Sequence, residues 1–156
     1  FEYKGFDLSI FFQWSYGNDV LNANRLFFEN VNNSRNLNQY ATYADRWTPE
    51  NPTSNIPVAK NSSSNKVVSS RVIEDGSFLR VNNITIGYTL PKLFVSKLNI
   101  QNIRIYVTGY NLHCFTKYSG TDPEVDCCTS TPMTPGIDYA AYPKSRSFVG
   151  GINVTF

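Results

Sequence analysis

Apolar and polar residues alternate along the first part of the chain. From Phe6 to Tyr16 every second residue is apolar, and most of the residues between them are polar. A strand separates such sets onto two faces, whereas a helix would scatter them around its circumference. The pattern predicts a strand over about 3–16, longer than the roughly 5–6 residues of most globular strands. Because a tilted strand needs roughly 9–11 residues to cross a bilayer, this length indicates a membrane-spanning strand.

Three more segments show the same period of two, so the sequence predicts an all-β fold. The four predicted strands occupy about 3–16, 77–90, 103–116 and 143–156. One apolar side of these strands is expected to face lipid. Its members are Phe6, Leu8, Ile10, Phe12, Trp14, Ile84, Ile86, Tyr88, Leu90, Phe148, Ile152, Val154 and Phe156.

In two of the predicted strands the pattern allows more than one assignment of residues to the apolar face. Leu79 and Val81 have the opposite parity to Ile84. They either face inward or are brought into phase by a bulge at Asn82-Asn83, because one extra residue exchanges the two faces. The next strand carries two competing apolar sets. One consists of Ile103, Ile105 and Val107, and the other of Tyr106, Tyr110 and Leu112.

The connections between the strands are long, short and long. Roughly 60 residues join the first two strands, about a dozen the next two and about 26 the last two, which matches the long external loops and short periplasmic turns of a transmembrane barrel. If the last strand ends in the periplasm, both long loops lie outside. Within the connections, Pro49 and Pro52 favour a rigid turn, and Pro91–Leu98 predicts a short helix with proline in its first turn.

Aromatic and charged residues gather in the two long connections. Aromatic rings can pack on sugar or peptide groups, and nearby carboxylates can bind their polar atoms. The alternative is that these side chains pack the loops together or contact a lid protein. The candidates for ligand or lid contact are Tyr43, Asp45, Arg46, Trp47, Tyr118, Asp122, Glu124, Tyr139 and Tyr142, together with Tyr40.

Composition narrows the class of protein further. The net charge is +2, from 14 basic and 12 acidic residues without a basic run, so nucleic-acid binding has little electrostatic support. No stretch approaches the roughly 18 apolar residues of a transmembrane helix. There is no signal peptide, and the first residues already predict a strand, so we expect the chain to begin within a larger protein. The sequence allows two states of the cysteines. One is a disulfide from Cys114 to Cys127 or Cys128, and the other is free thiols.

Catalytic and metal-binding groups are sparse. His113 is the only histidine, and no Ser-His-Asp or Cys-His pattern accompanies it. Asp122, Glu124 and Asp126 alternate, but the glycine and the fourth ligand of a calcium loop are missing. We therefore predict no enzyme activity, no cofactor and no metal site.

Several stretches carry a more specific pattern, and they cover nearly the whole chain. They are Lys4–Ser9, Tyr16–Val20, Arg46–Pro52, Ile73–Arg80, Asn83–Pro91, Tyr118–Val125, Tyr142-Pro143 with Arg146, and the terminal Phe156. In this order they resemble the C-terminal portion of the SusC/RagA-like TonB-dependent outer-membrane transporters of Bacteroidetes. Residues 1–156 would then be the last four antiparallel strands and two long extracellular loops of a transmembrane barrel.

The resemblance implies a plugged barrel of about 22 strands that imports oligosaccharides or peptides across the outer membrane. The implied partners are the rest of the barrel and its plug, a SusD-like surface lipoprotein, outer-membrane lipid, and TonB through an absent N-terminal part. The pattern of Val149, Gly151, Val154 and Phe156 also resembles the signal read by the barrel-assembly machinery. The implied location is the outer membrane, with extracellular loops and a periplasmic C-terminus.

Two other functions fit the same pattern. A secreted carbohydrate-binding β-sandwich would use the aromatic residues as a sugar platform, and it would bury one face of each sheet against a second sheet. A porin or adhesin that works without TonB would share the physics of the barrel. A soluble monomer would favour the sandwich, and an upstream plug domain would favour the TonB-dependent transporter.

Overall fold

The computed structural model describes residues 1–30, 38–59, 68–95, 100–127 and 136–156. The chain divides into two compact units. We call one the sheet unit, which consists of Phe1–Tyr16, Phe78–Thr116 and Lys144–Phe156. We call the other the loop unit, which consists of Gly17–Ser77 and Lys117–Pro143.

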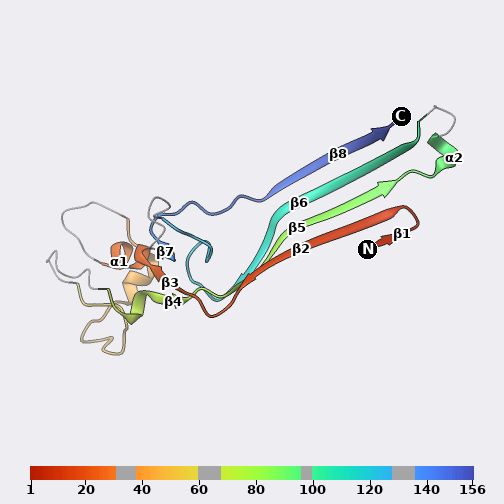
Figure 1. The fold of residues 1–156 in the computed structure, drawn as a ribbon. Coiled ribbons are helices and arrows are strands. Elements are labelled where there is room, and N and C mark those ends of the chain that lie inside the picture. Colours follow the sequence, from red (N-terminus) through yellow and green to blue (C-terminus); the bar gives the residue numbers. More distant parts are fainter. Residues whose placement is uncertain (31–37, 60–67, 96–99, 128–135) are drawn as a thin grey trace. The chain divides into compact units, whose positions relative to one another are not determined.

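The sheet unit is a single antiparallel sheet with the strand order β1-β2-β5-β6-β8 (Figure 1). Its strands are β1 (Glu2–Tyr3), β2 (Phe6–Ser15), β5 (Phe78–Thr89), β6 (Asn102–Thr116) and β8 (Ser147–Thr155). The four long strands are therefore the four that hydrophobic periodicity predicts, but the first and the last begin later than expected. Residues 143–146, expected to begin the last strand, precede β8.

A tight turn separates β1 from β2, where the sequence pattern predicts one continuous strand from residue 3. Lys4 and Gly5 have φ angles of 47° and 87°, the left-handed conformation of a two-residue hairpin turn. A Cβ atom on Gly5 would lie 2.8 Å from the carbonyl oxygen of Thr89. The main chain of Gly5 instead accepts a hydrogen bond from Thr89 N at 2.7 Å, so this close approach favours glycine.

The connection between β5 and β6 contains the short helix α2 (Lys92–Val95) directly after Pro91. The helix predicted over Pro91–Leu98 therefore exists in its first part, and residues 96–99 lie outside the described residues. No helix within the described residues is long and apolar enough to span a membrane.

The loop unit contains regular structure that hydrophobic periodicity misses. A small sheet has the order β4-β3-β7, in which β3 pairs antiparallel with β4 and parallel with β7. Its strands are β3 (Asp19–Asn22), β4 (Ile73–Asp75) and β7 (Ile137–Asp138). Helix α1 (Ala23–Phe28) and the 3-10 turns η1 (Ala41–Asp45) and η3 (Ser70–Val72) accompany it.

The hydrophobic core of the loop unit is small. Val20 and Val72 are fully buried, and Val20 packs with Tyr118 and Val125. The proline-rich segment forms a turn, as predicted, in which Asn51 N donates to the carbonyl oxygen of Thr48 at 2.9 Å. The contacts of Val20 with Tyr118 and Val125 join segments that are far apart in the sequence, which explains why no local pattern predicts them.

Candidate functional site

One face of the long sheet is apolar across its four long strands. Residues that lie opposite each other on neighbouring strands share a face, and the register pairs Leu8 with Ile86, Ile86 with Val107 and Ile105 with Ile152. The exposed members of the predicted lipid-facing set are Phe6, Leu8, Ile10, Phe12, Trp14, Ile86, Phe148, Ile152, Val154 and Phe156. The half-buried members are Ile84, Tyr88 and Leu90. An apolar surface of this extent requires an apolar environment or a partner.

A bulge in β5 keeps this face continuous. Phe11 pairs with Asn83 and Phe12 with Val81, so Asn82 is the extra residue. Val81 consequently lies on the same face as Phe12. This confirms the bulge alternative for the change of parity in the sequence.

The register also assigns the faces of β6, which the sequence pattern left open. Ile105 pairs with Tyr88 and Val107 with Ile86, so both lie on the apolar face. Tyr106 lies on the opposite face, where its ring covers Gly151 of β8. A Cβ atom on Gly151 would be 2.5–2.8 Å from the ring and hydroxyl of Tyr106.

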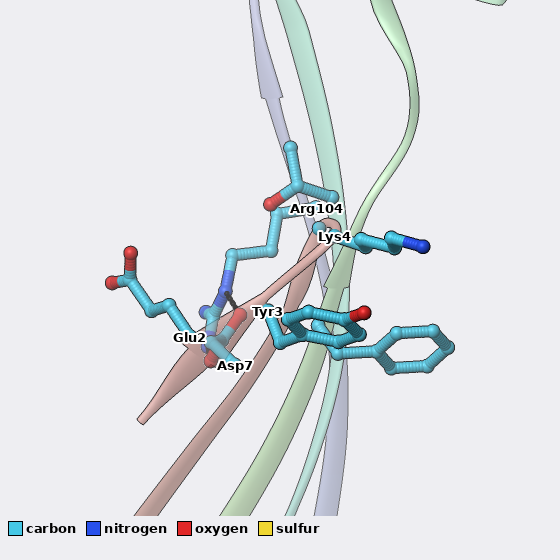
Figure 2. Close-up of a pocket in the computed structure, with 8 residues that line it drawn as sticks. Glu2, Tyr3, Lys4, Asp7 and Arg104 are labelled. Carbon is cyan, nitrogen blue, oxygen red and sulfur yellow. Dashed lines mark hydrogen bonds and ion pairs between the residues drawn. The ribbon is translucent and has the colours of Figure 1, made fainter.

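The opposite face carries polar pairs. Arg104 Nε donates to Asp7 Oδ1 at 2.8 Å, and its Nη2 atom donates to the other carboxylate oxygen (Figure 2). The pair passes over Gly87, where any Cβ atom would collide with both side chains. A cavity of about 600 Å³ adjoins the pair, lined also by the hairpin Glu2–Phe6 and by Thr89. Since the two charges satisfy each other, this cavity offers a ligand no uncompensated charge from the pair.

The polar face continues along the sheet. The hydroxyls of Thr85 and Thr108 are 2.9 Å apart and share a hydrogen bond. The guanidinium of Arg80 lies 5.6 Å from the ring centre of Phe78, and Arg80 is only 4% exposed. One face thus suits lipid and the other suits water or polar protein.

Four charged side chains form a network in the loop unit. Arg25 contacts Glu29 and Glu74, each at 3.1 Å, and Arg71 contacts Glu29 at 2.5 Å. Burial alone would raise the pKa of Glu74, but hydrogen bonds from Ser119, Arg25 and Asn22 outweigh it and hold the pKa below its ordinary value. The network therefore ties α1, β4 and the segment after β6 together.

A second polar contact lies in the core of the loop unit. Tyr118 donates its hydroxyl hydrogen to Asp138 Oδ2 at 2.7 Å. Burial, the bond to Asp138 and nearby negative charge raise the pKa of Tyr118. Tyr118 is 6% exposed and Asp138 is fully buried, so this hydrogen bond is part of the packed core of the loop unit.

The candidate residues of the long connections separate into buried and exposed groups. Tyr43, Tyr118 and Asp122 are buried, and Asp122 accepts a hydrogen bond from Glu124 N at 2.9 Å. For these three residues the structure therefore favours the alternative hypothesis, in which the side chains pack the loops together. The exposed or half-exposed candidates are Tyr40, Asp45, Arg46, Trp47, Glu124, Tyr139 and Tyr142.

Two of the exposed candidates have aromatic contacts of their own. The Arg46 guanidinium lies 5.3 Å from the ring centre of Tyr43, and Tyr139 packs on Phe27 at 4.7 Å between ring centres.

Cys114 lies in the sheet unit and Cys127 in the loop unit. Cys128 lies outside the described residues, so the prediction about cysteine pairing stays open.

Sequence reasoning missed the charge network. One signal was present, because Arg25 and Glu29 are four residues apart and such pairs meet on a helix. Glu74 and Asn22 gave no comparable signal, since they meet only through the small sheet.

Comparisons with known proteins give one consistent result. No family model matches the chain. TonB-dependent receptor P3 of Formosa agariphila is 37% identical over 99% of this chain, and TonB-dependent receptor SusC of Bacteroides thetaiotaomicron is 27% identical over 99%. A solved structure of the RagAB peptide transporter matches 99% of the chain with a TM-score of 0.80 and 29% identity.

The matches cover this chain but only part of each relative. The chain spans 15% of receptor P3, 14% of SusC and 16% of the matched RagAB chain. TonB-dependent receptors are outer-membrane β-barrel transport proteins and not enzymes, in agreement with the predicted class. Over its whole length, the chain is thus a homologue of a segment of the SusC- and RagA-like TonB-dependent receptors.

Proposed function

We propose that this chain forms the last four membrane strands and two extracellular loops of a TonB-dependent transporter that imports oligosaccharides or peptides. The transporter would work with a SusD-like surface lipoprotein. Its barrel of about 22 strands would hold a plug, and TonB would contact a part of the protein outside this chain. These features rest on the family and on the physics of the sheet.

The observation that carries the proposal is the two-sided sheet. It has one continuous apolar face and one polar face, and its long strands suffice in length to cross a bilayer at roughly 9–11 residues each. A sheet with open edges cannot stand alone in lipid, because unpaired backbone groups there are costly. Both β1 and β8 are edge strands, so the sheet needs further strands on either side.

The connections support the proposed orientation. In an antiparallel sheet, β2 ends and β5 begins at the same end, and β6 ends and β8 begins there too. Both long connections therefore leave from one end of the sheet, which would be the extracellular end. The C-terminal strand would end in the periplasm, where the barrel-assembly machinery would bind it.

The secreted β-sandwich finds no support in the sheet unit. A sandwich covers the inner face of each sheet with a second sheet. Within the described part of the sheet unit no second sheet covers the apolar residues, and Phe148 and Ile152 are 70% and 65% exposed. The similarity to TonB-dependent receptors likewise favours a TonB-dependent transporter over a porin or adhesin.

We further propose that the exposed loop aromatics contact the substrate or the lipoprotein lid. Trp47, Tyr139 and Tyr142 are 38%, 40% and 89% exposed. The charged candidates are Asp45, Arg46 and Glu124, of which the first two directly precede Trp47. The exposed surface of these rings can contact a partner while the loop unit stays folded.

The test uses the full-length protein that contains this chain, in its native host. Affinity purification from detergent-solubilised outer membranes should yield a surface lipoprotein in equimolar amount. Deleting the gene should abolish growth on at least one oligosaccharide or peptide, and removing TonB should have the same effect. Uptake that continues at full rate without TonB would contradict the proposal.

A further inference from the structure

One histidine lies on the apolar face of the long sheet. His113 of β6 pairs with Val81, and Val81 pairs with Phe12 on that face. His113 is exposed, and its ring meets the ring of Phe115 edge-on with 4.4 Å between the ring centres. Phe115 follows two residues later in the strand, so this contact agrees with the register. An imidazole thus lies on a face that otherwise consists of apolar or aromatic side chains and glycine.

The position of His113 along β6 corresponds to the headgroup layer of a bilayer. Ile105 pairs with Ile152 near the middle of the span, and His113 comes eight residues later in β6. At roughly 3.3 Å per residue and a tilt of roughly 45°, this is about 17–19 Å from the middle. The hydrocarbon ends at about 15 Å from the middle. In a membrane, His113 would therefore meet lipid headgroups and not the centre of the acyl chains.

Aromatic side chains accompany His113 at this end of the sheet. We call it the loop end, formed by Ser15, Phe78, Thr116 and Ser147, because both long connections leave the sheet there. Phe115 pairs with Leu79, which pairs with Trp14. Phe115 and Trp14 are 56% and 73% exposed. Aromatic rings favour the boundary between acyl chains and headgroups, so the loop end has the composition of a membrane interface.

A basic residue lies close to His113 at the loop end. The segment before β8 lies beside β6, because Asn111 Nδ2 donates to the carbonyl oxygen of Ser145 at 3.0 Å. Arg146 is the next residue and is exposed. It precedes Phe148 of the apolar face by two residues, so alternation predicts the same side for its side chain. Arg146 and His113 thus flank Asn111 from β8 and from β6.

The carboxylates of the sheet unit lie at its other end. The only acidic residues of this unit are Glu2 and Asp7, in β1 and at the start of β2. Near the loop end, Lys144 and Arg146 are both exposed. Basic side chains without a carboxylate of the same unit beside them suit an anionic ligand.

We propose that His113 and Arg146 bind the phosphate-bearing headgroup of a lipid in the outer leaflet, while Phe115 packs on its acyl chains. A guanidinium can donate two parallel hydrogen bonds to a phosphate, and an imidazole can donate one in either protonation state. The inference rests on the proposed membrane location and adds a lipid ligand to it. A protein partner is the less suitable occupant, because exposed aromatic rings beside the two donors fit a molecule that also carries acyl chains.

The test measures lipid binding by the full-length receptor, purified in a non-ionic detergent. Native mass spectrometry counts the bound lipid during titration with diphosphoryl lipid A, and again with dephosphorylated lipid A. His113→Phe removes the nitrogen donors and keeps a ring beside Phe115, and Arg146→Gln removes the charge. Lys92→Gln is the matched control, because Lys92 is an exposed cation of α2 at the other end of the sheet.

We expect the unmodified receptor to bind diphosphoryl lipid A about tenfold or more tightly than dephosphorylated lipid A. Combining His113→Phe with Arg146→Gln should weaken the binding of diphosphoryl lipid A about tenfold, the effect of losing one or two charged hydrogen bonds. Lys92→Gln should leave the affinity unchanged.

Equal affinity of the unmodified receptor for the two lipids would overturn the proposal, and this comparison needs no variant. A folded double variant that binds diphosphoryl lipid A as tightly as the unmodified receptor would also overturn it. If the double variant keeps the lipid and loses the co-purified surface lipoprotein, the two side chains bind a protein instead. If the unmodified receptor is missing from outer-membrane fractions, the proposed membrane function itself fails.

Discussion

A charge placed on the apolar face of β8 should disrupt membrane insertion, whereas the same charge on the neighbouring residue should not. Ile152 pairs with Ile105 and is 65% exposed on the apolar face, whereas Asn153 pairs with Arg104 on the polar face. Replacing either by lysine adds the same charge at almost the same height of the strand. The two variants therefore differ only in the face that receives the charge.

The magnitude follows from the position of Ile152 in its strand. Ile152 is the sixth of nine residues in β8, so its side chain would lie near the middle of the hydrocarbon layer. A lysine facing lipid there costs about 2–4 kcal/mol and much less near the interface. Asn153→Lys faces the polar side, and its proximity to Arg104 should cost about 0.5 kcal/mol by like-charge repulsion. The expected difference between the variants is thus about 2–3 kcal/mol.

The assay compares the full-length receptor and both variants. Urea unfolding from lipid vesicles gives the free energy of unfolding, and the heat-modifiable folded band in outer-membrane fractions gives the assembled fraction in cells. Ile152→Lys should lower both quantities strongly, and Asn153→Lys should stay close to the unmodified protein. Equal losses in the two variants, or a larger loss in Asn153→Lys, would refute the assignment of the faces.

Two further substitutions test the polar face and the loop unit. Gly151→Ala should destabilise the receptor by about 1–3 kcal/mol because the new methyl group displaces the ring of Tyr106. A Cβ atom on Gly150 would lie 3.7 Å from Val107 Cγ2, so Gly150→Ala should change the urea stability by less than about 0.5 kcal/mol. Glu74→Gln should cost the loop unit about 2 kcal/mol at neutral pH. Since the folded pKa of Glu74 lies below its ordinary value of 4.5, its stabilisation is present above that pH and is lost as pH falls through the folded pKa. Protease resistance of the loops measured between pH 6 and 3 should show this loss in the unmodified protein and not in Glu74→Gln.

Periodicity predicted the long strands because every second residue of each strand lies on the same face and meets the same apolar or polar surroundings. The strand over 77–90 needed one further piece of information, since the parity of Leu79 and Val81 has two explanations. Only the register with β2 separates them. The same holds for the faces of β6, because Ile105 and Tyr106 both belong to apolar sets and the identity of their neighbours decides between them.

The loop unit was much less predictable for a different reason. Its strands are two to four residues long, which is too short to show a period. Asn22 and Glu74 are separated by 52 residues in the sequence and acquire a role only through pairing of β3 with β4. The sequence marked the loop aromatics as candidates for contact, but it could not distinguish the buried Tyr43 and Tyr118 from the exposed Tyr142.

Strand pairing in the long sheet also brings together the points at which the long connections leave it. Ser15 pairs with Phe78, and Phe78 pairs with Thr116, so three chain segments leave the sheet from adjacent positions. Closing a long loop costs less when its ends are already fixed together. The antiparallel pairing resumes in the loop unit, where Asp19 pairs with Asp75. A register error between β3 and β4 would move Glu74, which pairs with Val20 in this ladder, away from Asn22 and Arg25. The charge network thus depends on the register of β3 with β4, which no periodicity in these short strands encodes.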